Sequence, residues 1–444
     1  MSLIEKLYGI INEAKTEYEN AEAGIFKKVS QSKGASGNGL LVKGDNIKWM
    51  KYMLDTGYKG KINLICIDPP FFSGVNYDAI VKIDSDKIKS LPPVKLYAYH
   101  DVWDKGMEGY LRSLCTRFYL MRDLLADDGC IWVHLDWHAA HYVKIIMDEV
   151  FGEKNFINEV IWNYKSGGTS KRHFSRKHDT LLFYSKTGKY YFKPQREKSY
   201  NRSFKAYRFK GVKEYRDDLG WYTMVNMKDV WQIDMIGRTS AERTGYATQK
   251  PEALIMRIIE SCSREGDICA DFFGGSGTLA SAADKLGRRW ISCDSGGPAF
   301  SAAEKRLAGA GVDFIALEQA KSIQDEVKCV LKADINVRPV ELSDKVILNV
   351  NLISYNVDVD KISIGEDSKK VVKNIIKSDP LCLIDYWSVD FDFNGEVHNS
   401  DIIIFSGRDK EYGCEKIGNS FNSVSIHIID VFGNSTFVTW SGGV

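Results

Sequence analysis

The feature that most constrains the fold is a short apolar run that stops at Asp-Pro-Pro-Phe. Residues 62–67 read Ile-Asn-Leu-Ile-Cys-Ile, a pattern that predicts a strand buried on both faces of a parallel sheet. Two consecutive prolines continue neither a sheet ladder nor a helix, so the chain must turn outward directly after Asp68. The sequence therefore predicts an α/β fold with Asp68 at the carboxyl end of a strand, where open α/β sheets bind ligands.

A second predicted strand lies well downstream and leads into a glycine-rich turn. Residues 266–286 predict a strand, this turn and a helix. That order lets a backbone approach a nucleotide-like cofactor closely, with the N–H groups of the helix facing it. The next strand is predicted over 288–294, and the separation of Asp271 and Asp294 fits the roughly twenty residues between such a turn and a ribose-binding carboxylate. Asp294 is therefore the ribose candidate; the alternative is a glycine-rich connection that binds no ligand.

The glycine-rich turn lacks both common phosphate-binding patterns. It has neither the GK[ST] ending of a P-loop nor the G-x-G-x-x-G of a dinucleotide fingerprint. A cofactor with one ribose and no phosphate is therefore favoured, and S-adenosylmethionine fits this description. The cofactor-binding residues predicted here are Asp271, Phe272, Phe273, Gly274, Gly275, Ser276, Gly277 and Thr278.

Three separated motifs occur in a characteristic order, namely Asp68 to Phe71, Thr248 to Pro251 and Asp271 to Thr278. In this order the chain resembles the amino-methylating DNA methyltransferases of the permuted, or beta, class. It is most similar to adenine-specific enzymes such as the modification subunits of type III restriction systems. The resemblance covers residues 39–307. Two positions depart from the family pattern: Phe71 stands where Tyr is commonest, and Phe272 where Pro is usual.

The resemblance implies a fold, a reaction and catalytic residues. The fold is a Rossmann-like doubly wound methyltransferase sheet with an inserted target-recognition region and a small C-terminal β domain. The reaction is methyl transfer from S-adenosylmethionine to N6 of an adenine flipped out of duplex DNA. An exocyclic amine is a poor nucleophile until acceptors hold its N–H groups, and Asp68 with a nearby backbone carbonyl suits that role. Phe71 suits stacking on the base. The catalytic set is Asp68, Pro69, Pro70 and Phe71.

Two more cofactor residues follow from the resemblance. In the family, a Gly-Asp pair after an early strand contributes to the adenine pocket of the cofactor, which implies this role for Asp45; a plain helix cap is the alternative. The turn at Lys250 borders the methionine end of the cofactor in the family. We therefore expect Lys250 to pair with the cofactor carboxylate.

Residues 162–216 carry a strong local charge that the net charge of +1 conceals. They hold sixteen Lys or Arg against three Asp or Glu, with thirteen Phe, Tyr or Trp between them. This composition is typical of a surface that contacts phosphates and stacks on bases, and in the family the same interval holds the target-recognition region. A solvated basic face is the alternative. The predicted DNA-binding residues are Lys165, Lys171, Arg172, His173, Arg176 and Lys177.

At 444 residues, two or three domains are expected. The predicted divisions are 1–35, an amphipathic helix over 2–29 that runs into a linker; 36–320, the methyltransferase domain with its target-recognition region at 160–246; and 335–444, a β-rich domain. From Ile335 onward the chain has sixteen acids against ten bases. A negative module is a poor grip on a duplex, so this domain is expected to be structural or to bind protein.

The sequence favours neither a membrane protein nor a metal site. The chain has no run of eighteen apolar residues and its start lacks the apolar centre of a signal peptide, so a cytoplasmic protein without a membrane partner is expected. Nine scattered cysteines without a C-x-x-C pair are typical of reduced core thiols. His134, Asp136, His138 and His141 invite a zinc reading, but we expect no metal because a strand and a helix need not bring them together.

Other functions stay open at this point. N4 of cytosine is an alternative target, since both amines need the same acceptors, and RNA is an alternative substrate. A non-catalytic DNA-binding specificity subunit is a rival from another class. The sequence also leaves open a homodimer and a restriction or helicase partner subunit.

Overall fold

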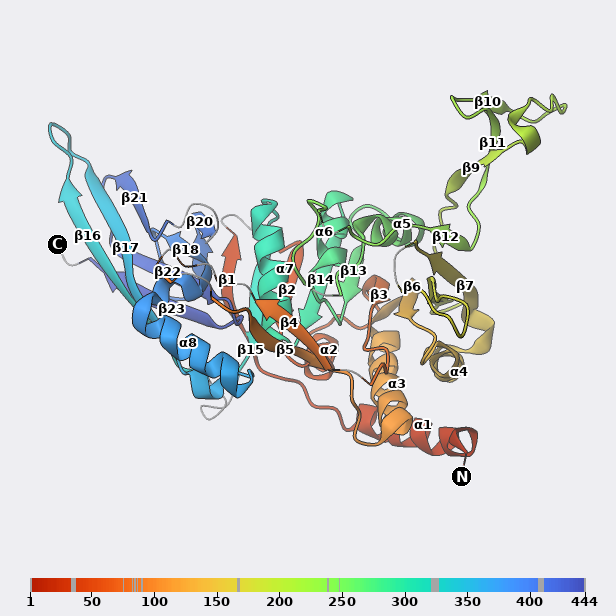
Figure 1. The fold of residues 1–444 in the computed structure, drawn as a ribbon, viewed down its shortest axis with the longest axis horizontal. Coiled ribbons are helices and arrows are strands. Elements are labelled where there is room, and N and C mark those ends of the chain that lie inside the picture. Colours follow the sequence, from red (N-terminus) through yellow and green to blue (C-terminus); the bar gives the residue numbers. More distant parts are fainter. Residues whose placement is uncertain are drawn as a thin grey trace.

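One large mixed sheet organises the chain (Figure 1). The structure is a computed structural model that describes residues 2–32, 37–74, 76–81, 83, 85, 87–88, 91–165, 168–237, 239–246, 248–320, 327–405 and 411–442. In order across the sheet, the strands are β12 (Val230–Gln232), β7 (Phe156–Asn163), β8 (His178–Ser185), β6 (Leu125–Leu135), β3 (Ile62–Ile67), β13 (Ile268–Asp271), β14 (Arg289–Asp294), β2 (Gly39–Lys43), β15 (Ile315–Gln319), β1 (Phe26–Ser32) and β19 (His398–Ser400).

Six neighbouring strands, from β6 to β15, run parallel. The strand β3 is apolar on both sides because each side meets a separate core: Ile65 and Ile67 face one, and Leu64 and Cys66 face the other. On one face the helices are α1 (Leu3–Glu19), α2 (Asn46–Asp55), α3 (Gly106–Leu124) and α4 (Ala140–Phe151). On the other face they are α5 (Glu252–Cys262), α6 (Thr278–Lys285) and α7 (Gly297–Gly309). The predicted doubly wound α/β fold is confirmed.

The carboxyl ends of the central strands place four acidic side chains at one edge of the sheet. Asp68 follows β3, Asp271 and Asp294 end β13 and β14, and Asp45 follows β2 by two residues. These strands are parallel neighbours or next neighbours, so their ends share an edge. Chain segments that are far apart in sequence therefore meet around one site.

A separate three-stranded sheet projects from the body within the predicted target-recognition region (Figure 1). Its strands are β9 (Arg196–Tyr200), β10 (Glu214–Arg216) and β11 (Trp221–Asn226). Large apolar side chains near its tip are exposed, with Phe204 at 53%, Phe209 at 63% and Leu219 at 67%. We call residues 196–226 the arm.

The C-terminal region forms two small antiparallel sheets, as the fold prediction expected. One contains β16 (Cys329–Pro339), β17 (Val346–Val357) and β21 (Gly413–Gly418). The other contains β18 (Ile384–Asp390), β20 (Ile402–Phe405), β22 (Ser423–Asp430) and β23 (Ser435–Ser441). The region also has a helix, α8 (Glu366–Ser378), that the turn-rich pattern does not predict. Because β16 begins before residue 335, that boundary cuts a strand; the other domain limits stay predictions.

The prediction of one helix over residues 2–29 is wrong in its second half. α1 ends at Glu19, and β1 pairs antiparallel with β15 and parallel with β19. The partners of β1 come from the far end of the chain, so its local sequence carries no trace of them. Residues 33–36 of the predicted linker lie outside the described residues. After the Asp68 motif, β4 (Asn76–Val81) and β5 (Val94–His100) form a hairpin.

No helix within the described ranges combines the length and the apolar character needed to cross a bilayer.

Candidate active site

Asp68 lies at the turn directly after β3, between two basic side chains. Its Oδ1 lies 2.8 Å from Nδ1 of His134, and its Oδ2 accepts a hydrogen bond from Lys250. The Phe71 ring meets the His134 ring edge-on, with centroids 5.1 Å apart, and Lys250 Nζ lies 5.2 Å from the Phe71 centroid. The sequence analysis assigned Lys250 to the cofactor; the structure brings it to the aspartate.

The charge on Asp68 is compensated by these neighbours. Burial by itself opposes ionisation, but Lys250 and His134 hold the pKa of Asp68 below its usual range. Asp68 is therefore an ionised hydrogen-bond acceptor at neutral pH. The pKa of His134 is raised: burial acts against its charge, and the carboxylates of Asp68 and Asp179 outweigh that effect.

Buried groups hold the turn that carries Pro69 to Phe71 in place through hydrogen bonds. Asp101 has no exposed surface and accepts hydrogen bonds from the backbone N–H groups of Phe72, at 3.0 Å, and Ser73, at 2.6 Å. Phe72 has a φ of 61°, a conformation that a bulky residue keeps only under such constraint. The Tyr110 hydroxyl donates to the Pro70 carbonyl at 2.8 Å. The position of Phe71 is thus fixed by its surroundings.

The glycine-rich turn after β13 packs tightly against the end of β14. A Cβ on Gly274 would lie 2.2 Å from Ser292 Oγ, so only glycine fits there. Gly277 has a φ of 72° and caps α6. Asp294 accepts backbone hydrogen bonds from Gly275, at 2.9 Å, and Gly296, at 2.8 Å. Gly274, Gly275 and Ser276 of this turn line the cavity described below.

Asp271 is a buried carboxyl group at the centre of this edge. Burial, together with the charges of Asp68 and Asp294, raises the pKa of Asp271 to about 8, although Phe273 N–H donates to it at 2.9 Å. Burial also raises the pKa of Asp294. A positively charged ligand group here would stabilise the ionised carboxylates.

Asp45 caps a helix and also borders the cavity, while its role in a cofactor pocket stays a prediction. Its Oδ1 accepts from Lys48 N–H at 2.9 Å and so caps α2. It also lines the cavity described below, where Asn46 beside it donates to the Phe272 carbonyl at 2.8 Å. The end of β2 is thereby joined to the glycine-rich turn.

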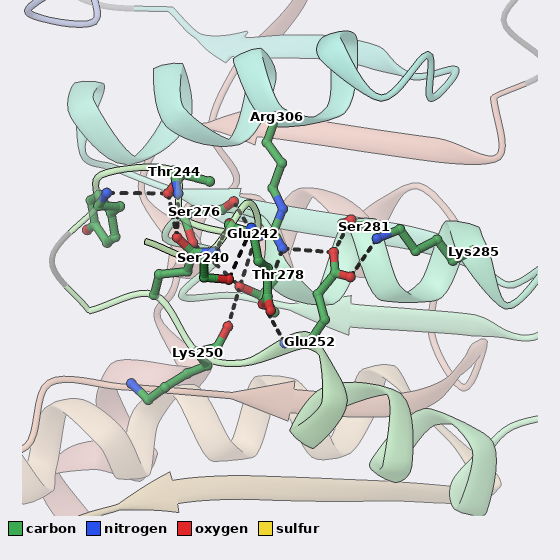
Figure 2. A network of polar contacts seen from close by, with 12 residues as sticks. Ser240, Glu242, Thr244, Lys250, Glu252, Ser276, Thr278, Ser281, Lys285 and Arg306 are labelled. Atoms are coloured by element: carbon green, nitrogen blue, oxygen red, sulfur yellow. Dashed lines mark hydrogen bonds and ion pairs between the residues drawn. The ribbon is translucent and has the colours of Figure 1, made fainter. Parts of the chain in front are cut away.

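A polar network fastens the segment before α5 to the glycine-rich turn (Figure 2). Arg306, from α7, reaches Glu252 at 2.8 Å and Thr278 Oγ1 at 3.1 Å. Glu252 N–H donates to Glu242 Oε1 at 2.7 Å, and Glu252 also contacts Lys285 at 2.5 Å. The segment carrying Lys250 is therefore anchored through its neighbours on both sides.

One cavity joins these parts. Its volume is about 510 Å³, which suits a cofactor-sized ligand. It is lined by the four residues Asp68 to Phe71 and by all the predicted cofactor residues except Gly277. Tyr246 and His134 also line it, and a Cβ on Gly275 would lie 3.4 Å from the Tyr246 ring.

The predicted DNA-binding residues lie apart from the cavity wall, in the connection between β7 and β8. Lys165, Lys171, Arg172, His173 and Arg176 are exposed and Lys177 is half-buried. Phe174 at the centre of this loop is 99% exposed. Arg176 stacks on Trp137 at 3.8 Å. Two residues of the segment, 166 and 167, lie outside the described residues. The loop leads directly into Asp179, which contacts His134.

The sequence analysis missed three site residues: His134, Asp179 and Tyr246. His134 was weighed only as a zinc ligand. In the structure His138 contacts Asp136 at 2.6 Å while His134 turns to Asp68, and the described residues hold no cluster of three metal ligands. For His134, the available signal was a titratable residue near the carboxyl end of a buried strand.

The chain is similar to known DNA methyltransferases. A family model described as DNA methylase, for N6 and N4 methyltransferases, matches residues 62–305. The type II methyltransferase M.EcaI of Enterobacter cloacae is 28% identical in an alignment of 324 positions that covers 60% of this chain and 68% of that protein. The Mod subunit of the type III enzyme EcoP15I of Escherichia coli is 26% identical, over 35% of this chain and 25% of that one. Among solved structures, the cytosine-N4-specific PvuII DNA methyltransferase aligns over 62% of this chain and 90% of its own, with 15% identity and a TM-score of 0.41.

The residues that the family model matches include both the Asp68 to Phe71 corner and the glycine-rich turn. The chain belongs to the DNA methylase family of N6 and N4 amino-methyltransferases. The predicted resemblance to this family is confirmed, and the cofactor of the family is S-adenosylmethionine, as predicted. The family includes both adenine and cytosine enzymes, so the base is a separate question.

Proposed function

We propose that the protein is a site-specific DNA methyltransferase that methylates N6 of an adenine flipped out of duplex DNA. The observation that carries the proposal is the single cavity between the Asp68 to Phe71 corner and the glycine-rich turn. A base at the Asp68 to Phe71 corner and a methyl donor at the glycine-rich turn would be held in the same cavity. Holding two reactants in position in this way accelerates a transfer between them. Adenine is preferred over cytosine by family resemblance, since Asp68 stands where cytosine enzymes commonly have Ser.

The cofactor residues fit S-adenosylmethionine by charge and shape. When bound, this cofactor supplies a methyl group on a positively charged sulfonium. Asp294 and Asp271 would accept from its ribose and balance its positive groups, and Asp45 would border its adenine. Gly274, which lines the cavity, keeps the turn packed against Ser292. Lys250 lies within reach of both ends of the site, since it donates to Asp68 and sits beside the glycine-rich turn.

The base site needs two acceptors and a stacking face. Asp68 Oδ1 is directed to His134 and Oδ2 accepts from Lys250, so the second lone pair of Oδ2 would accept one N–H of the target amine. The Pro70 carbonyl already accepts from Tyr110, which favours the Pro69 carbonyl as the second acceptor. Phe71 would stack on the base and needs no hydroxyl to do so.

Duplex DNA is the proposed partner of the basic loop 165–178 and of the arm. Both carry exposed aromatic side chains among Lys and Arg, and phosphate attraction with base stacking explains that combination. The relatives include proteins named as Mod subunits and others named as type II methyltransferases. A restriction or helicase subunit and a homodimer are therefore further proposals, to be tested by native mass spectrometry of the purified protein.

The test is mass spectrometry of nucleosides from DNA incubated with the protein and isotope-labelled S-adenosylmethionine. We expect label in N6-methyladenine, and Asp68→Ala to reduce it at least about 100-fold because the amine loses its charged acceptor. Asp55→Ala, an exposed carboxylate that pairs with Lys51, is the matched control and retains full transfer. Label in N4-methylcytosine would correct the base. Undiminished transfer by Asp68→Ala would refute the role of Asp68.

If no base of DNA is labelled, the enzyme proposal fails for DNA, and RNA is tested in the same way. A titration of tryptophan fluorescence with S-adenosylmethionine separates the remaining rival. A specificity subunit that has lost its chemistry has no reason to keep micromolar cofactor binding.

A further inference from the structure

His134 lies between two carboxylates that belong to different strands. Nδ1 faces Asp68 Oδ1 at 2.8 Å, and Nε2 faces Asp179 Oδ2 at 3.2 Å. Asp179, near the start of β8, also accepts from the Tyr164 hydroxyl at 3.1 Å. The His134 residue is 3% exposed, so water does not replace either contact.

This geometry requires both ring nitrogens of His134 to carry a proton. A neutral imidazole has one N–H group, and its other nitrogen would point a lone pair at an ionised carboxylate. Lys250 donates to the opposite oxygen of Asp68, which keeps that carboxylate ionised. The imidazolium satisfies both carboxylates with charge-assisted hydrogen bonds.

We propose that His134, held as an imidazolium by Asp179, is a positioning residue that fixes the Asp68 carboxylate for methyl transfer. The proposal rests on the proposed function. With Oδ1 bound to His134 and Oδ2 to Lys250, the Asp68 carboxylate is held in one orientation, and the second lone pair of Oδ2 would accept from the target amine. The His134 ring also meets the edge of the Phe71 ring, so one side chain locates both the acceptor and the stacking face.

The charged groups that face His134 come from three elements. They are Asp68 after β3, Asp179 in β8 and Lys250 before α5; Tyr164, in neutral form, completes the set through Asp179. Two carboxylates outweigh burial and one ammonium and raise the pKa of His134, so the imidazolium is lost only as the pH rises above that raised pKa.

The test compares kcat against pH for the wild type, His134→Asn and Asp179→Asn, at saturating cofactor. His134→Asn keeps a neutral donor toward Asp68 without the positive charge. We expect its kcat to fall about 10- to 100-fold, with the KM for S-adenosylmethionine within about twofold of the wild type, because orientation is lost and cofactor contacts are not. The alkaline decline of kcat should disappear in His134→Asn and move to lower pH in Asp179→Asn.

The controls separate positioning from folding and from failure of the proposed function. His141→Asn, on the exposed side of α4, should leave the profile unchanged. The His134 ring is titrated directly by NMR in the full-length protein, with its signal assigned by its loss in His134→Asn. The wild type could lack transferase activity while NMR shows His134 protonated above pH 7 and this protonation lost in Asp179→Asn. That result would refute the proposed function and support the imidazolium. A neutral His134 at pH 7, or an unaltered kcat profile in His134→Asn, would overturn the inference.

Discussion

Single side chains at the site are balanced by partners from distant parts of the chain. Asp68 is compensated by His134 from β6 and by Lys250 from the segment before α5. For Asp271, the charges of Asp68 and Asp294 outweigh the opposite effect of Lys250. The corner is therefore ionised where the amine would bind, and partly protonated at the cofactor side.

Asp271 should make cofactor binding pH-dependent. Its pKa of about 8 means that it is mostly protonated at pH 7 in the free protein, and a cationic cofactor favours the ionised form. Binding then releases a proton, and affinity should weaken as the pH falls below about 8, by up to tenfold per unit. Calorimetry in buffers of different ionisation enthalpy measures the release. Asp271→Asn should lose it and Asp55→Asn should keep it; equal affinities at about pH 6 and 8 in the wild type would contradict the assignment.

Elements around the site are joined by polar contacts where loops would otherwise be free. The segment 239–251 has no regular secondary structure of its own in the described residues, and it is fastened to α5, α6 and α7 by the network around Glu252 (Figure 2). Burial by itself would raise the pKa of Glu252, but Lys285, Ser281 and Arg306 hold it below its usual range. This segment carries Tyr246 and Lys250 into the cavity.

Arg306→Ala should weaken cofactor binding without removing any residue that lines the cavity. The substitution removes the cation that Glu242 and Glu252 share, while Glu252 keeps Lys285, so we expect a loss of about 1.5–3 kcal/mol of stability, the range for a hydrogen bond to a charged group. We expect a lower melting temperature and a Kd for S-adenosylmethionine raised by about tenfold, with kcat at saturation nearly unchanged. Arg338→Ala, which removes an exposed pair with Glu415, is the matched control. A cofactor Kd equal to that of the wild type would show that the network does not support the site.

Across the whole molecule, the C-terminal sheets are joined to the methyltransferase sheet rather than merely appended. Strand β19 extends the large sheet by pairing with β1, and Lys43 at the end of β2 donates to the Gly433 carbonyl at 2.7 Å. A Cβ on Gly433 would lie 2.2 Å from the Gly297 carbonyl oxygen at the start of α7. That contact lies only three residues after Asp294, so the C-terminal region supports the cofactor side of the cavity.

Gly433→Ala should therefore destabilise the protein far more than its backbone conformation alone explains. Gly433 has a φ of 78°, and Gly395 has a φ of 91° with open space around it. At either position, alanine in the left-handed conformation costs about 1–2 kcal/mol of stability. Only at Gly433 does the added Cβ also clash with the backbone of Gly297. Urea unfolding of both variants measures the difference. Equal losses of stability would show that the contact between Gly433 and Gly297 tolerates an added methyl group.

Local pattern predicted much of the site but not its connections. The strands that end at Asp68, Asp271 and Asp294 were predicted within one or two residues, because an apolar run followed by proline or glycine encodes a buried strand and a turn. The hairpin β4–β5, the strand β1 and the helix α8 were not predicted. The strand β1 pairs with remote strands, and Val94 and Leu96 of β5 pack into the C-terminal core, and local sequence encodes neither contact.

The sequence by itself determined the motifs, their order and the edge of the sheet at which they meet, because parallel strands bring their carboxyl ends together whatever surrounds them. Tertiary structure decided which side chains touch. The order β8, β6, β3 placed Asp179, His134 and Asp68 in line, and the packing of α7 brought Arg306 to Glu252. These contacts depend on strand order and helix packing, which follow from the burial of the whole chain and not from any one stretch of it.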